Sequence, residues 1–142
     1  MTKGNPEAKR RQQEAELQIT VAQYLNTVLR RDALFHSVPN EGERSASATA
    51  LLLKMGLYPG AADLVVYHGG RAFLIELKLE TNRYYRTERS RQSNEQKAFQ
   101  RHARRAGAPY AICRNTDEVG AFLASQGIPL RLSAWTKTRR AA

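Results

Sequence analysis

Two carboxylates and an amine, from Asp63, Glu76 and Lys78, are the side chains whose types and spacing most favour catalytic chemistry in this sequence. They lie in two short apolar runs that are separated by the pair Gly69-Gly70. Such a pair between apolar runs predicts a β-hairpin with a two-residue turn, because the tight primed turns need positive φ at their central residues. In this register Asp63 lies directly opposite Glu76.

The hairpin would place all three charged groups on one face. Side chains alternate along a strand, so Lys78 lies on the same side as Glu76, and the Cβ atoms of Asp63 and Glu76 are roughly 5 Å apart. Two like charges at that distance repel each other, and each loses free energy when it is desolvated. A divalent cation bound between them would remove both penalties, and hard oxygen ligands favour Mg²⁺ or Mn²⁺. A three-residue turn would instead place Asp63 on the opposite face.

A further carboxylate lies near the start of the chain. Residues 12–31 are predicted to form a helix whose apolar stripe is made by Leu17, Val21, Tyr24, Leu25 and Val28. Glu14 points into the sector of this stripe, with Gln18 one turn later, whereas Glu16 points to solvent. A carboxylate on a core-facing stripe needs a partner, which a metal site would supply. The alternative is that Glu14 lies in a frayed first turn, where acidic residues suit the helix dipole.

A glutamine is the last candidate for this site. Ser93 and Gln96 have the spacing of a capping box, which predicts a helix from this point to about Ala106. Gln96 shares a helix face with Phe99 and Ala103, and this face turns toward the sheet. A role toward the sheet therefore remains open for Gln96 beside its capping role, while Ser93 is interpreted as a cap.

At these residues the sequence resembles a known family. The segment Gly60-Ala61-Ala62-Asp63, followed by Glu76-Leu77-Lys78, resembles the core of the PD-(D/E)XK nuclease superfamily, and more closely its VRR-NUC branch. The resemblance extends from about Glu14 to Gly127, and further fragments in the same order support it: residues 14–18, 40–44, 53–56 and 93–96. It implies one α/β domain over residues 1–142, a PD-(D/E)XK nuclease-like mixed β-sheet flanked by helices.

The resemblance also implies an activity. Proteins of this kind resemble Mg²⁺-dependent structure-specific DNA endonucleases, and some small phage-type members act as homodimers on four-way (Holliday) junctions. We therefore expect Mg²⁺ or Mn²⁺ held by Asp63, Glu76, the Leu77 carbonyl and Glu14, with Lys78 and Gln96 as catalytic neighbours. A non-catalytic basic DNA-binding module and a less selective phage-type nuclease are the alternatives.

The charge balance favours a nucleic-acid partner. The chain has 23 Lys and Arg against 13 Asp and Glu, a net charge of +10, and a pI near 10.3. Arginines alternate with tyrosines between residues 80 and 91, a pattern that suits phosphate contacts and stacking on bases, although a charged surface loop would look the same. The residues predicted to contact DNA are Asn40, Arg44, Arg83, Tyr84, Arg86, Arg89 and Arg91.

Composition limits the remaining possibilities. No apolar run approaches the roughly 20 residues that cross a bilayer, and no signal peptide is visible, so no membrane partner is expected. Cys113 is the only cysteine, which excludes an intrachain disulfide and favours the cytoplasm of a bacterium or a phage-infected host. The expected order of the secondary-structure elements along the chain is helix, strand, helix, hairpin, helix, strand, helix. Residues 1–11 and 131–142 are basic, and we expect flexible termini there.

Overall fold

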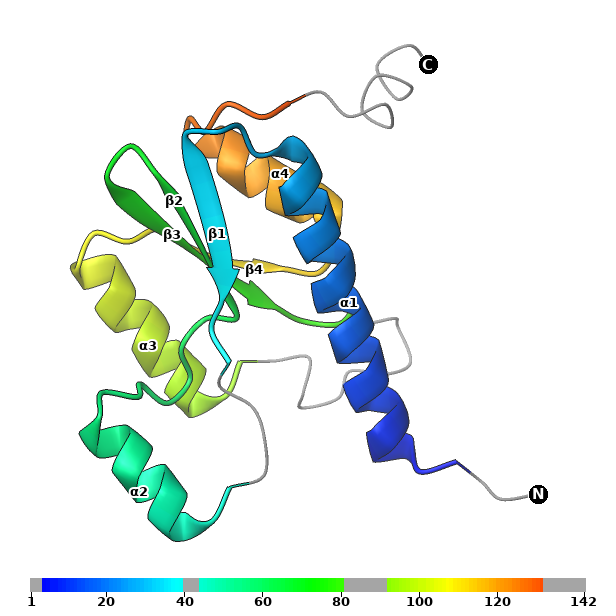
Figure 1. The fold of residues 1–142 in the computed structure, drawn as a ribbon, viewed down its shortest axis with the longest axis vertical. Coiled ribbons are helices and arrows are strands. Elements are labelled where there is room, and N and C mark those ends of the chain that lie inside the picture. Colours follow the sequence, from blue (N-terminus) through cyan, green and yellow to red (C-terminus); the bar gives the residue numbers. More distant parts are fainter. Residues whose placement is uncertain (1–3, 40–43, 81–91, 132–142) are drawn as a thin grey trace.

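The chain forms an α/β fold, a mixed β-sheet flanked by helices, as the sequence predicts (Figure 1). A computed structural model describes residues 4–39, 44–80 and 92–131. The sheet has the strand order β1-β2-β3-β4; the first three strands are antiparallel, and β4 is parallel to β3. The elements are α1 (Pro6–Val28), β1 (Ala33–Ser37), α2 (Ala46–Lys54), β2 (Leu64–His68), β3 (Arg71–Leu77), α3 (Asn94–Arg105), β4 (Tyr110–Cys113) and α4 (Thr116–Ser125).

The hairpin of β2 and β3 has the predicted two-residue turn. Gly69 and Gly70 have φ angles of 58° and 76°, and His68 pairs with Arg71. The register is therefore confirmed, and it places Asp63, one residue before β2, at the level of Glu76.

The histidine at the hairpin turn contacts the residue that precedes β1. His68 is half-buried, and its Nε2 lies 3.2 Å from Oδ2 of Asp32. The reason is that β1 begins beside the turn, with Ala33 opposite His68, so that the preceding residue reaches the imidazole.

The sheet carries a hydrophobic core on each face, although Leu34 and Tyr67 on the α3 face stay exposed. α1 and α4 cover one face, and α3 covers the other (Figure 1). On the α1/α4 face the core includes Leu25, Val66, Phe73, Ile75 and Leu123. On the α3 face it includes Ala62, Val65, Leu74, Ala103 and Tyr110. Full burial of each large apolar side chain contributes about 1.5–3 kcal/mol, so the two faces together fix the hairpin that carries the charged residues.

The first helix is longer at its start, and shorter at its end, than the sequence analysis expected. It begins at Pro6, so the segment predicted to be a flexible terminus is helical over its second half. The Asn5 side chain accepts a hydrogen bond from the Glu7 N–H (3.1 Å), and proline at the first helical position needs no N–H partner. The helix ends at Val28, after which Leu29 forms a β-bridge with Leu130. Among the described helices, none is long and apolar enough to cross a membrane.

Gly120 marks the close contact between α4 and α1. A Cβ at this position would collide with the Tyr24 hydroxyl oxygen. We expect Gly120→Ala to destabilise the wild-type protein, although alanine normally favours a helix by about 1 kcal/mol over glycine. In a Tyr24→Phe background the same substitution should become stabilising by about that amount. Urea unfolding of the four proteins measures this change of sign; an identical effect in both backgrounds would contradict the packing.

Candidate active site

A cavity of about 340 Å³ lies between α1, the end of β3 and the start of α3. It brings together all five side chains that the sequence predicts to be catalytic. The residues that line it include Arg11, Glu14, Gln18, Asp63, Glu76, Leu77, Lys78, Leu79 and Gln96. Residues from positions 14 to 96 thus meet at one place, because the hairpin and two helices converge there.

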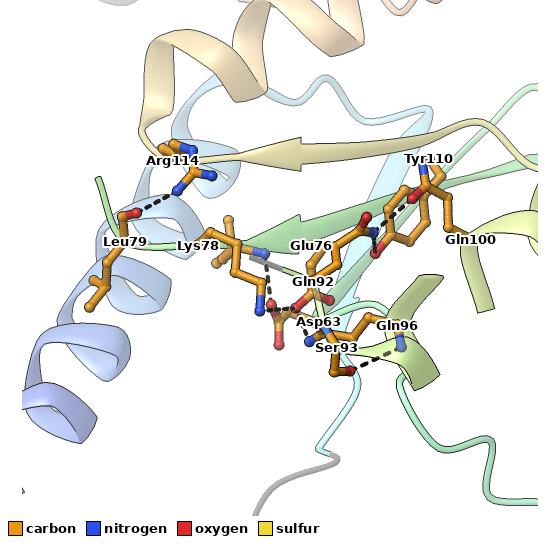
Figure 2. A network of polar contacts seen from close by, with 11 residues as sticks. Asp63, Glu76, Lys78, Leu79, Gln92, Ser93, Gln96, Gln100, Tyr110 and Arg114 are labelled. Atoms are coloured by element: carbon orange, nitrogen blue, oxygen red, sulfur yellow. Dashed lines mark hydrogen bonds and ion pairs between the residues drawn. The ribbon is translucent and has the colours of Figure 1, made fainter. Parts of the chain in front are cut away.

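Glu76 is the buried carboxylate of this cavity, with 2% of its surface exposed. Gln96 Nε2 donates a hydrogen bond to its Oε1 at 2.7 Å, and Lys78 Nζ lies 3.9 Å from the same oxygen (Figure 2). The Lys78 side chain is itself only 12% exposed. A buried carboxylate requires partners of this kind, a hydrogen-bond donor and a nearby positive charge.

Asp63 is fixed by contacts on both sides. Its Oδ2 accepts a hydrogen bond from the Leu77 N–H at 2.7 Å, and its backbone oxygen accepts one from the Val38 N–H at 2.8 Å. The side chain therefore continues the hairpin beyond the last strand pair, Leu64 with Ile75. It presents a second carboxylate to the cavity that Glu76 lines.

Gln96 caps α3 and also contacts the buried carboxylate of Glu76, while its role beside a metal stays a prediction. Its backbone N–H donates to Ser93 Oγ (3.1 Å), and its Oε1 accepts from the Ser93 N–H (2.9 Å), which completes the capping box. Its Nε2 donates to Glu76 (Figure 2). The side-chain amide oxygen of Gln96 thus caps the helix, and the amide nitrogen binds Glu76 in the cavity. The first turn of α3 therefore holds Glu76 in place.

The oxygen donors of the cavity fit one hard divalent cation. The carboxylates of Asp63 and Glu76 line the cavity, as does Leu77, whose carbonyl is the predicted third ligand; carboxylate and carbonyl oxygens are ligands that Mg²⁺ prefers, with waters completing its coordination. Glu14 is half-buried and lines the same cavity, whereas Glu16 is exposed. Within residues 4–39, 44–80 and 92–131, however, no three His, Cys, Asp or Glu side chains are close enough to hold a metal ion together. A ligand role for Glu14 stays a prediction.

Arg114 is a residue of this region that the sequence analysis missed. Its Nη1 donates to the Leu79 carbonyl oxygen at 2.6 Å (Figure 2). The Lys78 N–H donates to the Cys113 carbonyl oxygen at 3.1 Å. The end of β4 therefore holds the chain immediately after the Glu-x-Lys motif. No local signal points to Arg114, because its proximity depends on the parallel pairing of β3 with β4.

The residues predicted to contact DNA are mostly not described. Arg44 is exposed, next to Ser45, whose Oγ accepts a hydrogen bond from Ala48 N–H at the start of α2. The other predicted contacts, Asn40, Arg83, Tyr84, Arg86, Arg89 and Arg91, lie outside the described residues. Their role in DNA binding stays a prediction.

We expect the buried side chains of Tyr110 and Cys113 to make the folded protein less stable at alkaline pH. Burial, and then the negative charge of Glu76, raises the pKa of Tyr110 from 10.0 to about 12, and burial raises the pKa of Cys113 from 9.0 to about 12. Both groups lose their protons at lower pH in the unfolded chain than in the folded one. Stability that is fully present below pH 9 should therefore fall as the pH rises toward 12. Urea unfolding between pH 8 and pH 11 measures this decline, which should be shallower in Tyr110→Phe; an equal slope would contradict it.

A comparison with solved structures finds a protein of similar fold. No family model matches the sequence, and no curated protein matches it. Among solved structures, a protein described as "VRR_NUC domain protein" aligns with a TM-score of 0.56 over 81% of this chain and 86% of that chain. The chain has the fold of a VRR_NUC domain. The two sequences are 21% identical, so it is the VRR_NUC fold that the comparison establishes, in agreement with the expectation from residues 60–63 and 76–78.

Proposed function

We propose that this protein is a metal-dependent endonuclease that hydrolyses phosphodiester bonds in DNA. The observation that carries the proposal is the meeting of Asp63, Glu76 and Lys78 on one cavity, with Glu76 buried. The name of the VRR_NUC structural neighbour and the net charge of +10 support it independently.

Asp63 and Glu76, with the Leu77 carbonyl, would hold Mg²⁺ or Mn²⁺. When bound, the cation supplies positive charge for the phosphoryl oxygens and increases the acidity of an attacking water. The protein's own contribution is to hold the two carboxylates: the Leu77 N–H orients Asp63, and the Gln96 amide orients Glu76. Because these donors are fixed before the substrate arrives, little reorganisation is needed during the reaction.

The reaction itself is a displacement at phosphorus. A water oxygen forms a bond to the phosphorus, the bond to one sugar oxygen breaks, and the proton that the water loses is balanced by one that the leaving oxygen gains. The Lys78 ammonium lines the cavity 3.9 Å from Glu76 Oε1, where it would orient the water or stabilise the negative charge of the transition state.

We propose branched DNA as the substrate and a homodimer as the active form. A two-fold dimer would present two such cavities to two symmetric strands of a four-way junction. A protein with one cysteine and this basic charge is suited to the cytoplasm, where DNA is its natural partner.

The test is a panel of labelled junction, flap, nicked and linear DNA, incubated with Mg²⁺, with Mn²⁺ or with EDTA. We expect cleavage only with a divalent ion, and cleavage of junction DNA before linear DNA. Metal-independent binding of every substrate without cleavage would instead identify a non-catalytic DNA-binding module. Equal cleavage of all substrates would identify a less selective nuclease, and analytical ultracentrifugation measures the oligomeric state.

A further inference from the structure

Gly60 lies where the backbone of α3 approaches the chain before Asp63. A Cβ built on Gly60 would lie 2.5 Å from the Glu95 carbonyl carbon and 2.6 Å from both the Gln96 nitrogen and the Glu95 oxygen. These are backbone atoms of the first turn of α3, which cannot rotate away as a flexible side chain would. Gly60 also has a backbone φ of +79°, an angle that residues with a side chain rarely adopt.

A second contact ties the same segment to α3. The Tyr58 ring packs edge-on against Phe99, with 5.0 Å between the ring centroids. Its hydroxyl lies 3.1 Å from His102 Nδ1. The segment from Tyr58 to Gly60 is therefore docked on α3 at two levels, directly before the chain reaches Asp63.

The contact of residues 58–60 with α3 connects the segment that leads to Asp63 with the helix turn that holds Glu76. The segment leads to one carboxylate, Asp63, and the helix turn that it touches carries Gln96, which holds the other carboxylate, Glu76. A displacement of the first turn of α3 away from Gly60 would move the amide of Gln96 relative to Glu76. Backbone atoms at 2.5–2.6 Å from the added Cβ lie well inside ordinary contact, which begins at 3.4 Å, so relief of the collision requires a shift approaching an ångström. A shift of that size would stretch the 2.7 Å hydrogen bond beyond its usual limit of about 3.2 Å.

We infer that Gly60 is a positioning residue of the active site: the absence of a side chain sets the separation between the Asp63 segment and α3, and thereby the Gln96–Glu76 hydrogen bond. The effect on cleavage rests on the proposed function, but the effect on the hydrogen bond does not. A side chain at Gly60 should disturb Gln96 even in the absence of metal and DNA.

The chain offers a matched control in Gly127. Its φ is +78°, close to that of Gly60, but no atom lies within 4 Å of a Cβ built there. Alanine at either position introduces similar backbone strain, and only Gly60→Ala adds the collision. A difference between the two variants therefore reports the contact with α3 and not the loss of a flexible residue.

The test is the NMR signal of the Gln96 side-chain amide in the metal-free protein, assigned by its loss in Gln96→Glu. We expect Gly60→Ala to shift this signal toward the position of a solvated glutamine, and Gly127→Ala to leave it unchanged. An unmoved Gln96 signal in folded Gly60→Ala would overturn the inference, as would equal shifts in both variants. If Gly60→Ala does not fold, Tyr58→Ala loosens the same docking from its exposed end, and an unmoved signal there would also overturn it.

The rate of DNA cleavage by the same variants is the second measurement. Gly60→Ala should lower kcat by at least about tenfold with little change in KM, because misplacement of supporting groups by a fraction of an ångström slows the chemical step. Gly127→Ala should cleave at the wild-type rate. A wild-type protein that does not cleave DNA would refute the proposed function and leave the NMR result to decide the role of Gly60. An active enzyme in which both variants cleave normally would refute the positioning role alone.

Discussion

Replacing Asp63 with asparagine is expected to lower DNA cleavage by about 10³-fold while the protein stays folded. The asparagine oxygen can still accept the hydrogen bond that the Leu77 N–H donates to Asp63 Oδ2 at 2.7 Å. The negative charge that would bind the cation is lost, so the substitution separates metal binding from hairpin structure. Single-turnover cleavage measures the loss, and thermal unfolding without metal should change by no more than about 2 °C.

Asp32 provides the matched control for this experiment. It is a 65% exposed carboxylate that pairs with His68, at the opposite end of the hairpin from Asp63. Asp32→Asn should leave cleavage unchanged and should alter stability by less than about 1 kcal/mol, because contacts made by exposed charged side chains contribute little. Full activity of Asp63→Asn, or an equal loss in both variants, would refute the assignment of Asp63 as a metal ligand.

Replacing Lys78 with methionine is the second substitution with a large expected effect. It removes the positive charge while retaining a long apolar side chain beside Glu76, whose side chain is 3% exposed. Cleavage should fall by about 10²–10³-fold, the usual loss on removing one group that stabilises transition-state charge. The buried carboxylate also loses a partner, so the free energy of unfolding should fall by about 1–3 kcal/mol.

A double variant distinguishes these two consequences. In Lys78→Met/Glu76→Gln neither charge is buried, and the amide of the new glutamine can still contact Gln96. The double variant should therefore recover most of the stability that Lys78→Met loses, while cleavage stays at the background rate. Lys97→Met, an exposed position on α3, should change stability by less than about 0.5 kcal/mol. Since the double variant also lacks the proposed metal ligand Glu76, the role of Lys78 in cleavage is decided by Lys78→Met alone: wild-type cleavage per folded molecule in that variant would show that Lys78 acts only on folding.

The parts of the fold that were predictable depend on local chemistry. The Gly69-Gly70 pair fixed the hairpin register, because positive φ at two consecutive residues permits only a few turns, and that register placed Asp63 at the level of Glu76. Helical periodicity likewise placed Glu14 on the side of α1 that lines the cavity and Glu16 outside it. The capping box at Ser93 located the start of α3 to the residue.

The parts that were missed depend on contacts between distant segments. The contribution of Arg114 requires the pairing of β4 with β3, and the close approach of Gly60 requires the path of α3, neither of which a local pattern contains. The early start of α1 is a different case. The signal Asn5-Pro6 was present in the sequence, but the charged residues after it resembled a solvated terminus more than a helix.

A crystal soaked in manganese and measured at the manganese absorption edge tests the central claim most directly. We predict one anomalous peak within coordination distance of the Asp63 and Glu76 carboxylates, and its loss in Asp63→Asn. A wild-type crystal without a peak in this cavity, at a manganese concentration that supports DNA cleavage in solution, would contradict the account.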